Sequence, residues 1–336
     1  MEHILRGLTG RPWLGFECVS DQRTVLDLNV LGLLAYIIVS GLRSTVLKGL
    51  QIRGAEHPIG GENPISFCNV FLISQSIVGL SIVLSDGPCS FTDINKLDRH
   101  GRWLIAADAF FGCFLAPMSF FLALDKLSVV TQTLLFSLTL PFTAVIALLW
   151  LKEKLPDRFW WSLALITAGL IAGKLLRPME MNDPGSANQT VGVIWALVSM
   201  SSLALRNSLR RKLAVYDICR GLSAGIPNLA GAIAFAIIAL QQYGPQHFFY
   251  LSFWWVLGVI AIYSITLCLG TELFRQFCQQ RFPVAQVGLA SSSTLVVTIL
   301  SAAIFLGEPL PVATIICMVL ILAGVTLRFA WPVRRD

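Results

Sequence analysis

Long apolar blocks, separated by short polar connections, limit what this chain can fold into more than any other feature of its sequence. A helix that crosses a bilayer needs about 20 mostly apolar residues. Because lipid offers the backbone no hydrogen-bond partners, each such block is expected to form a helix. The sequence therefore predicts an all-α membrane protein with ten transmembrane helices. The ten blocks are residues 27–49, 64–84, 102–124, 128–151, 157–176, 190–212, 221–240, 254–278, 284–306 and 310–331.

The charged residues indicate topology rather than a nucleic-acid partner. Only 13% of the residues are charged, whereas soluble domains carry roughly 25%. With the N-terminus placed in the cytoplasm and two intramembrane arginines set aside, 18 Lys and Arg residues fall inside and 5 outside. This positive-inside bias predicts a multi-pass protein with cytoplasmic N- and C-termini. Since no segment marks an organelle, we place it by default in a plasma or inner membrane.

Neither a metal site nor a cofactor is predicted. The eight cysteines are scattered and show no Cys-x-x-Cys spacing, and the four histidines form no cluster. Buried cysteine usually acts as a small apolar residue. No phosphate-binding glycine-rich loop and no Ser/His/Asp set stands out in the short connections, so the sequence predicts neither an ATP-driven pump nor an enzyme.

The chain is similar to itself when it is shifted by 155 residues. Residues 136–156 then lie over 291–311 without a gap. This similarity divides the ten spans into two halves of five, and an odd number means that the second half enters the membrane from the opposite side. Many secondary transporters are built from such inverted repeats. The predicted organisation is a cytoplasmic segment 1–26, a first five-helix repeat 27–176, an extracytoplasmic linker 177–189, a second five-helix repeat 190–331 and a cytoplasmic tail 332–336.

One arginine in each half lies near the end of an apolar block. A shift of 163 residues aligns Leu42-Arg43 with Leu205-Arg206. Each arginine is about six residues from its expected helix end, or roughly 9 Å at helical rise. We expect Arg43 and Arg206 to be symmetry mates that flank the two mouths of one central cavity. The alternative is that each guanidinium reaches up to the lipid headgroups.

The two matching segments resemble a known family. Residues 123–173 and 288–327 resemble the two copies of the EamA-like repeat of the drug/metabolite transporter superfamily. The marks of that repeat are a proline midway in helix 4, a glutamate at the helix 4–5 junction and a glycine late in helix 5. In this sequence they are Pro141, Glu153 and Gly169 in the first copy, and Glu308 and Gly324 in the second.

The second copy departs from the pattern, because Val296 stands where a proline is expected after a serine run. Serine can bend a helix by bonding to its carbonyl groups, so the second cavity wall is expected to be built differently. Glu153 and Glu308 are expected to organise helix junctions, since carboxylates are favourable near helix N-termini. The resemblance implies ten spans in two repeats and a carrier of small organic solutes, often an exporter of amino acids or other metabolites. It does not identify the solute.

Charged and phenolic side chains inside the spans are candidates for substrate binding or gating, because polar groups are costly there. Asp108 and Tyr263 occupy equivalent positions under the 155-residue shift. Glu272 and Arg275 are three residues apart and share one helix face. An internally neutralised ion pair would explain these two residues as well as a substrate or proton site would.

Uncharged side chains supply the remaining candidates. Gln132 lies on the helix that carries the repeat's proline, and Gln75 and Ser292 lie in other spans. For Gln132 the alternative role is an interhelical hydrogen bond worth about 0.6 kcal/mol. Tyr36 and Trp195 are expected to line the cavity, or else to pack between helices.

These features together predict a secondary transporter, an exporter or facilitator, that moves small organic metabolites such as amino acids by alternating access. Two alternatives stay open. One is a membrane-embedded enzyme that acts on lipid-linked substrates, and the other is a non-transporting channel or assembly subunit. The expected partners are a small-molecule solute and membrane lipid, and a monomer and a homodimer are both compatible with the sequence.

Overall fold

Helices account for nearly all of the regular structure. The computed structural model describes residues 22–60, 62–151, 161, 164–165, 168, 186–213, 216, 218–281 and 284–329, and none of these lies in a β-strand. The α-helices are α1 (Gln22–Glu56), α2 (Phe67–Asp86), α3 (Cys89–Thr92), α4 (Arg99–Asp108), α5 (Ala116–Lys126), α6 (Val129–Phe136), α7 (Thr139–Ile146), α9 (Ser186–Leu213), α10 (Ile226–Gln242), α11 (Trp254–Tyr263), α12 (Gly270–Arg281), α13 (Val284–Leu306) and α14 (Val312–Phe329). Short 3-10 segments are η1 (Asp93–Lys96) and η6 (Pro245–Ser252), and π-helical segments are η2 (Ala109–Leu115), η3 (Ala147–Leu151), η5 (Gly221–Gly225) and η7 (Ser264–Leu269).

The predicted all-α class is confirmed for the described residues, and the count of ten spans stays a prediction. Six helical stretches among these residues are long and apolar enough to cross a bilayer: Asn29–Glu56, Phe67–Asp86, Arg99–Lys126, Asn188–Arg210, Gly221–Gln242 and Trp254–Cys278. The predicted span at 284–306 is also helical, as are most of 128–151 and residues 312–329 of the predicted span at 310–331. Most of the block at 157–176 lies outside the described residues, as do Glu153 and Gly169, residues 177–185 of the linker and both chain ends.

A break divides the fourth predicted span, at the place where the sequence puts a proline. Helix α6 ends at Phe136 and α7 begins at Thr139, with a turn at Ser137 and Leu138. Pro141 has no N–H group, so it cannot bond to the carbonyl four residues earlier. The equivalent helix of the second half, α13, continues without interruption from Val284 to Leu306, with no break at its serine run and with Val296 at the place of the proline.

Two π-helical segments occupy equivalent places in the two halves. Segment η2 begins at Ala109 and η7 begins at Ser264, and these two residues coincide under the 155-residue shift. Each segment begins directly after one member of the equivalent pair Asp108 and Tyr263. A π-helical turn inside a helix is rare and often marks a functional site.

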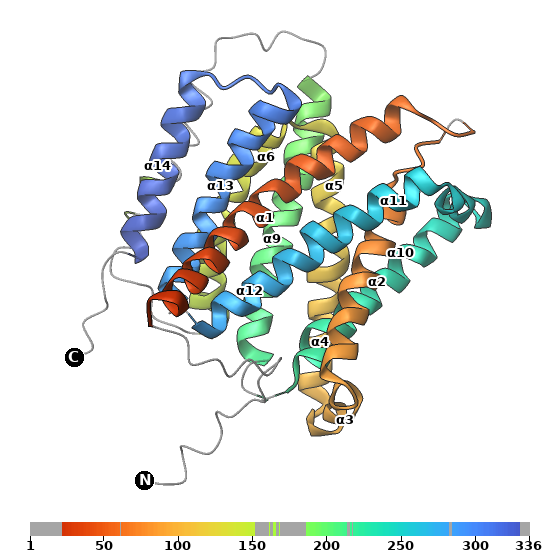
Figure 1. Cartoon of the computed structure of the whole chain (residues 1–336), viewed down its shortest axis with the longest axis horizontal. Coiled ribbons are helices and arrows are strands. Elements are labelled where there is room, and N and C mark those ends of the chain that lie inside the picture. The colour runs from red at the N-terminus through yellow and green to blue at the C-terminus, as the bar shows by residue number, and fades with distance from the viewer. Residues whose placement is uncertain are drawn as a thin grey trace.

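Helices of the two halves pack on one another in corresponding pairs. Helix α1 contacts α13 and α12, and its counterpart α9 contacts α7, α6, α4 and α5. Helix α2 packs along its own counterpart, α10. Figure 1 shows α1 rising from the lower to the upper edge of the bundle while α9 descends, and α2 descending while α10 rises. The start of α1 and the end of α14 lie at the same lower edge.

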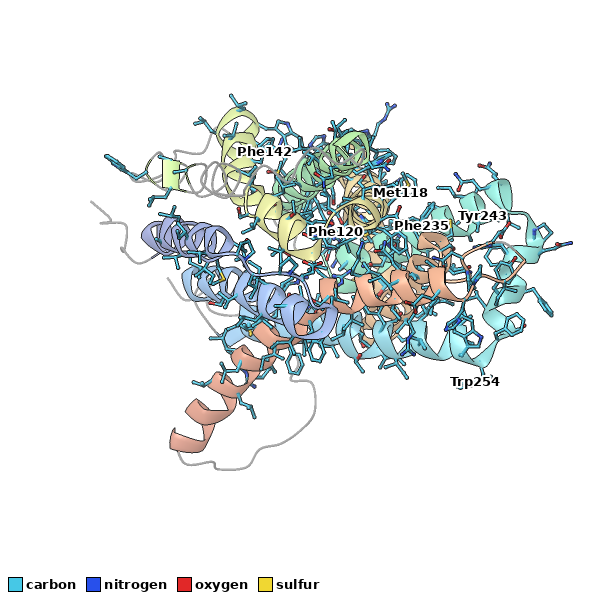
Figure 2. The ribbon with its side chains drawn as sticks, turned by 90° about the horizontal axis from the view of Figure 1, so that it is seen from above. Met118, Phe120, Phe142, Phe235, Tyr243 and Trp254 are labelled. Atoms are coloured by element: carbon cyan, nitrogen blue, oxygen red, sulfur yellow. The ribbon has the colours of Figure 1, made fainter. Side chains whose placement is uncertain are left out.

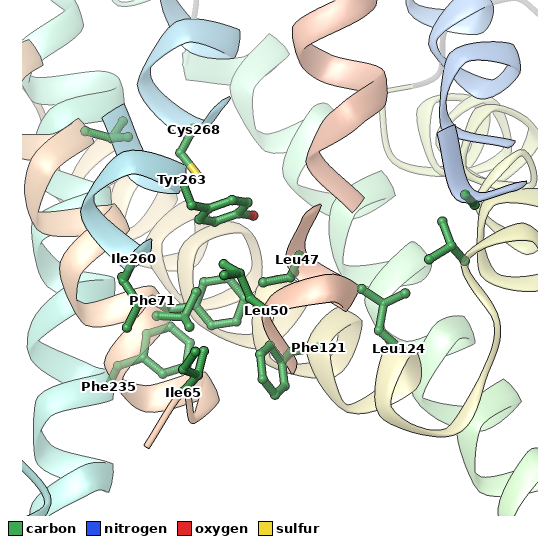
Figure 3. Packing of buried hydrophobic residues seen from close by; sticks show 14 of the residues in the cluster. Leu47, Leu50, Ile65, Phe71, Phe121, Leu124, Phe235, Ile260, Tyr263 and Cys268 are labelled. Carbon is green, nitrogen blue, oxygen red and sulfur yellow. The ribbon is translucent and has the colours of Figure 1, made fainter. Parts of the chain in front are cut away.

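The main apolar core fills the space between α1, α2, α5, α10 and α11. Phe71 lies at its centre, with ring centroids 5.2 Å from Phe235 and 6.0 Å from Phe121. Figure 3 shows Leu47 and Leu50 of α1 beside these rings, and the Tyr263 ring extending toward α1 above them. The view from above in Figure 2 places Phe120 near the middle of the bundle and Trp254 at its rim. Trp254 is 85% exposed, as expected for an aromatic ring at a membrane interface.

Glu308 joins the two halves by capping a helix of the other half. Its two carboxylate oxygens accept hydrogen bonds from the backbone N–H groups of Val129 (2.7 Å) and Val130 (2.9 Å) at the start of α6. Gly307, with φ of 66°, turns the chain sharply just before it, a conformation that suits glycine. The predicted role at a helix junction is confirmed for Glu308, although the helix that it caps is α6 and not the next helix of its own half.

Glu308→Gln is expected to lower the stability of the folded protein by about 1–2 kcal/mol, because an amide can accept only one of the two backbone hydrogen bonds and carries no charge. The apparent melting temperature of the purified protein in detergent measures this. Glu56→Gln, at the exposed end of α1, is the matched control and should change little. Equal melting temperatures for the two variants would show that the cap contributes nothing.

Candidate functional site

A cavity of about 510 Å³ lies between the two halves. Helices α1, α2, α5, α6 and α7 of the first half line it together with α9, α11, α13 and α14 of the second. Its aromatic wall is formed by Tyr36, Phe71, Phe120, Phe136 and Tyr263. Its hydroxyl groups come from Ser40, Ser44, Thr133, Ser137, Thr139, Ser199, Ser291, Thr294 and Thr298.

A second, smaller pocket of about 100 Å³ adjoins the cavity. The two spaces share wall residues, namely Arg43, Phe71, Gly112, Pro117 and Arg206. The smaller pocket adds polar side chains from α2, α10 and α12, which are Ser74, Gln75, Asn228 and Glu272. The two arginines therefore stand at the boundary between an apolar, hydroxyl-rich chamber and a more polar recess.

Arg43 is not near the end of its helix, as the sequence suggested, but near the middle. Helix α1 continues to Glu56 instead of ending at residue 49. The continuation is stabilised within the protein, because the Gln51 side chain donates a 2.9 Å hydrogen bond to the Phe121 carbonyl and the Lys48 ammonium donates to that of Leu124. Arg43 therefore contributes to the cavity wall.

Arg206 lies against the helix that carries Asp108. Its Nε atom is 3.4 Å from a carboxylate oxygen of Asp108, and its Nη2 atom is 3.3 Å from the Cys113 sulfur. Asp108 is fully buried and also pairs with Arg210, at 3.3 Å. The Arg206 side chain passes directly over Gly112, where a Cβ atom would come within 2.2 Å of it. Asp108 therefore positions Arg206 from behind and does not line either pocket itself.

Arg43 stands in an equivalent relation to the other half. It shares the cavity wall with Tyr263 and the smaller pocket with Cys268 and Glu272. Tyr263 and Cys268 correspond to Asp108 and Cys113 under the 155-residue shift. Each arginine thus contacts the π-containing helix of the opposite half.

Two further candidates face the smaller pocket. Glu272 forms a 2.5 Å ion pair with Arg275 and accepts a 3.2 Å hydrogen bond from Gln276, so the predicted internal pairing is present. Gln75 donates a hydrogen bond to the Cys113 carbonyl, while its Oε1 atom is buried without a hydrogen-bond partner. Both side chains are held by protein contacts and still present polar atoms to the recess.

The other predicted residues divide between the cavity wall and the packing between helices. Tyr36 lines the cavity and its hydroxyl lies 3.1 Å from that of Ser291. Gln132 is buried away from the cavity and donates a 3.0 Å hydrogen bond to the Phe120 carbonyl, which is the alternative role considered for it. Trp195 packs beside the apolar cluster of α5 and α9. The Ser292 side chain lies outside the described residues.

Two polar groups that the sequence did not reveal lie at opposite ends of the α2–α10 pair. At the start of α2, His247 binds the Ser66 hydroxyl at 2.7 Å and the Glu62 carboxylate at 3.2 Å. Although this is a Ser–His–Glu arrangement, the Tyr243 ring stacks on His247 at 4.2 Å, and neither pocket includes Ser66. It joins the α1–α2 connection to η6 rather than forming a cleft for a substrate.

At the other end of α2, Cys89, Cys219 and Asp86 come within 4.8 Å of one another. The Asp86 carboxylate accepts a 2.7 Å hydrogen bond from the Gly221 N–H group, so it caps the start of η5. Burial, together with the neighbouring Cys219 thiol, raises the pKa of the Cys89 thiol to about 12. The group holds the ends of the two halves together, and its members are too far apart in the sequence to show any ligand spacing.

Comparison with known proteins, like the resemblance seen in the sequence, indicates a transporter. Residues 59–172 match the EamA-like transporter family. The chain is 25% identical over 304 residues to the uncharacterized transporter sll1164 of Synechocystis. The aligned residues cover 88% of this chain and 85% of that protein. A crystal structure of another protein superimposes with a TM-score of 0.55 at 14% identity, over 90% of this chain and 96% of the other. That last likeness concerns the fold alone.

Proposed function

We propose that this chain, which carries an EamA-like transporter segment at residues 59–172, is a multi-pass membrane transporter. It would move small organic metabolites by alternating access. The observation that carries the proposal is a single cavity of about 510 Å³ with walls from both halves and one arginine from each. A space of this size suits a small organic molecule.

Ten transmembrane helices in two inverted five-helix repeats are the architecture that we propose for this carrier. Support comes from the opposite directions of α1 and α9 and of α2 and α10 in Figure 1. The equivalent π segments and the corresponding helix contacts give further support. Two similar units of opposite orientation can exchange their shapes, so that a cavity open to one side becomes open to the other.

The proposed binding residues are those that line the two connected spaces. Arg43, Arg206, Tyr36 and Tyr263 would contact the solute in the cavity. Gln75 and Glu272 would act from the smaller pocket. Asp108 is assigned a positioning role, because it contacts Arg206 and lines neither space. Gln132 and Trp195 are assigned to packing.

Solute flux into proteoliposomes tests this function. The purified full-length protein is expected to give saturable uptake of at least one radiolabelled metabolite from an amino-acid and organic-acid panel. Preloading the vesicles with the unlabelled solute should accelerate that uptake, because a carrier returns faster when its binding site is occupied. Uptake that rises linearly with concentration and shows no acceleration would indicate a channel. Appearance of a covalently altered product would instead indicate an enzyme.

A further inference from the structure

The charges around the two spaces indicate which solutes the carrier would accept. We propose that the solute is an organic anion whose carboxylate or phosphate group binds between Arg43 and Arg206. This inference rests on the proposed transport function and makes its substrate class specific. It depends on three observations: the balance of charges, the surroundings of each arginine and the lining of the rest of the cavity.

Positive side chains outnumber negative ones around the two connected spaces. The guanidinium groups of Arg43 and Arg206 line them, against one carboxylate, that of Glu272. Directly behind the walls lie two further guanidinium groups, those of Arg210 and Arg275, and one further carboxylate, that of Asp108. Glu272 forms an ion pair with Arg275, and one oxygen of Asp108 forms ion pairs with both Arg206 and Arg210. The described residues therefore leave an excess of two positive charges at a depth where charge is costly.

Arg43 is the clearest case of a charge that is available to a ligand. It lies near the middle of α1, yet its side chain is exposed, and the surface it exposes faces the cavity. Among the residues that the structure describes, no carboxylate forms an ion pair with it. Charge is costly at the depth of a membrane span, so a bound anion would supply the opposite charge that the described residues do not place against Arg43.

Arg206 is held in a fixed position with hydrogen-bonding capacity to spare. The Asp108 carboxylate forms an ion pair 3.4 Å from its Nε atom, which has no hydrogen-bond partner, and Nη2 donates a hydrogen bond to the Cys113 sulfur. A guanidinium carries five N–H donors in a planar fork that matches a carboxylate or phosphate group. Because Arg206 lines both spaces, its remaining donors are available to a solute there.

The rest of the cavity suits the body of an organic anion rather than a bare inorganic ion. Phe71, Phe120 and Phe136 give it apolar surface, and serine and threonine hydroxyls give it neutral hydrogen-bonding groups. The larger cavity has no carboxylate in its wall among the described residues. A cationic solute would therefore find no opposite charge in the larger space, whereas a carboxylate on an apolar body would meet both of its requirements.

Ligand-induced thermal stabilisation of the detergent-purified, full-length protein tests the proposal. The anionic probes are phenylacetate, 4-phenylbutyrate, succinate and phenyl phosphate, and the matched neutral and cationic probes are phenylacetamide and 2-phenylethylamine. Inorganic phosphate shows whether a bare anion is enough. At least one organic anion is expected to bind about tenfold or more tightly than the amide. Arg43→Gln and Arg206→Gln should each weaken that binding by a similar factor, whereas Arg53→Gln, exposed on the same α1 helix, should not.

Conservative variants keep the test informative if a glutamine variant fails to fold. Arg43→Lys and Arg206→Lys retain the charge but not the forked geometry, and they should also bind the anion more weakly. Equal or tighter binding of the amide or the amine, no binding by any anion, or anion binding that ignores both arginines would overturn the proposal. Saturable flux of a neutral or cationic solute would overturn the anion assignment alone, while anion binding without any saturable flux would overturn the transport function alone.

Discussion

Transport is expected to stop, to the background of empty liposomes, when the double variant Thr45→Cys, Ser301→Cys is oxidised. The two hydroxyl oxygens are 2.6 Å apart, between α1 of the first half and α13 of the second. Two cysteine sulfurs at these positions need to approach only slightly further to reach the roughly 2.05 Å of a disulfide. Alternating access requires the halves to move against each other, so a covalent bond between them should hold one state.

Two controls accompany this prediction. A thiol reductant should restore flux, because it breaks the new bond without altering the protein otherwise. Each single variant should keep its flux under the same oxidant, which also controls for the native cysteines. Full activity of the crosslinked protein, with the crosslink shown by mass spectrometry, would mean that α1 and α13 move as one body and that the halves do not separate there.

Loss of the Asp108 carboxylate is expected to have the largest effect on stability. Asp108→Ala should cost about 3–5 kcal/mol, because it removes a fully buried carboxylate and leaves the partly buried Arg206 and Arg210 guanidinium groups without their shared partner. The apparent melting temperature of the detergent-solubilised protein measures the effect. Asp125→Asn is the matched control, since Asp125 is 53% exposed and pairs with Lys126 at 2.9 Å. An exposed pair of that kind contributes about 0–1 kcal/mol.

Asp108→Glu separates the charge from the exact geometry. It keeps a carboxylate near both arginines, so it should recover most of the stability lost in Asp108→Ala. If Asp108→Ala is as stable as the Asp125→Asn control, the arginines are neutralised in some other way. In that case Asp108 would not position Arg206 as we infer.

Much of the helical architecture could be predicted from hydropathy, because a backbone without lipid hydrogen-bond partners has few ways to cross a bilayer. Hydropathy does not locate the ends of helices equally well. The apolar block at α1 stops near residue 49, but the helix continues because Lys48 and Gln51 find carbonyl acceptors on α5. Such partners come from the tertiary fold, so no local pattern at residues 48–56 indicates them.

For the candidate site, the sequence singled out residues that line the cavity as well as residues that do not. Internal similarity singled out Arg43 and Arg206, and the structure places both in one cavity wall, where their part in binding stays a proposal. The cost of intramembrane polarity also singled out Gln132 and Trp195, which pack between helices instead. Composition shows that a polar group is unusual in a span, but only packing decides whether it faces a cavity or a neighbouring carbonyl.

Segments η2 and η7 have a mechanical consequence for such a carrier. A wider helical turn contains an additional residue, and its return to ordinary α geometry would turn one side of the helix by about 100° against the other. Asp108 and Tyr263 sit at the junctions where that rotation would begin. Each of these two helices thus has a segment at which it could rotate, adjacent to a residue that touches an arginine of the opposite half. Such a rotation would change the direction of side chains without separating the packed helices.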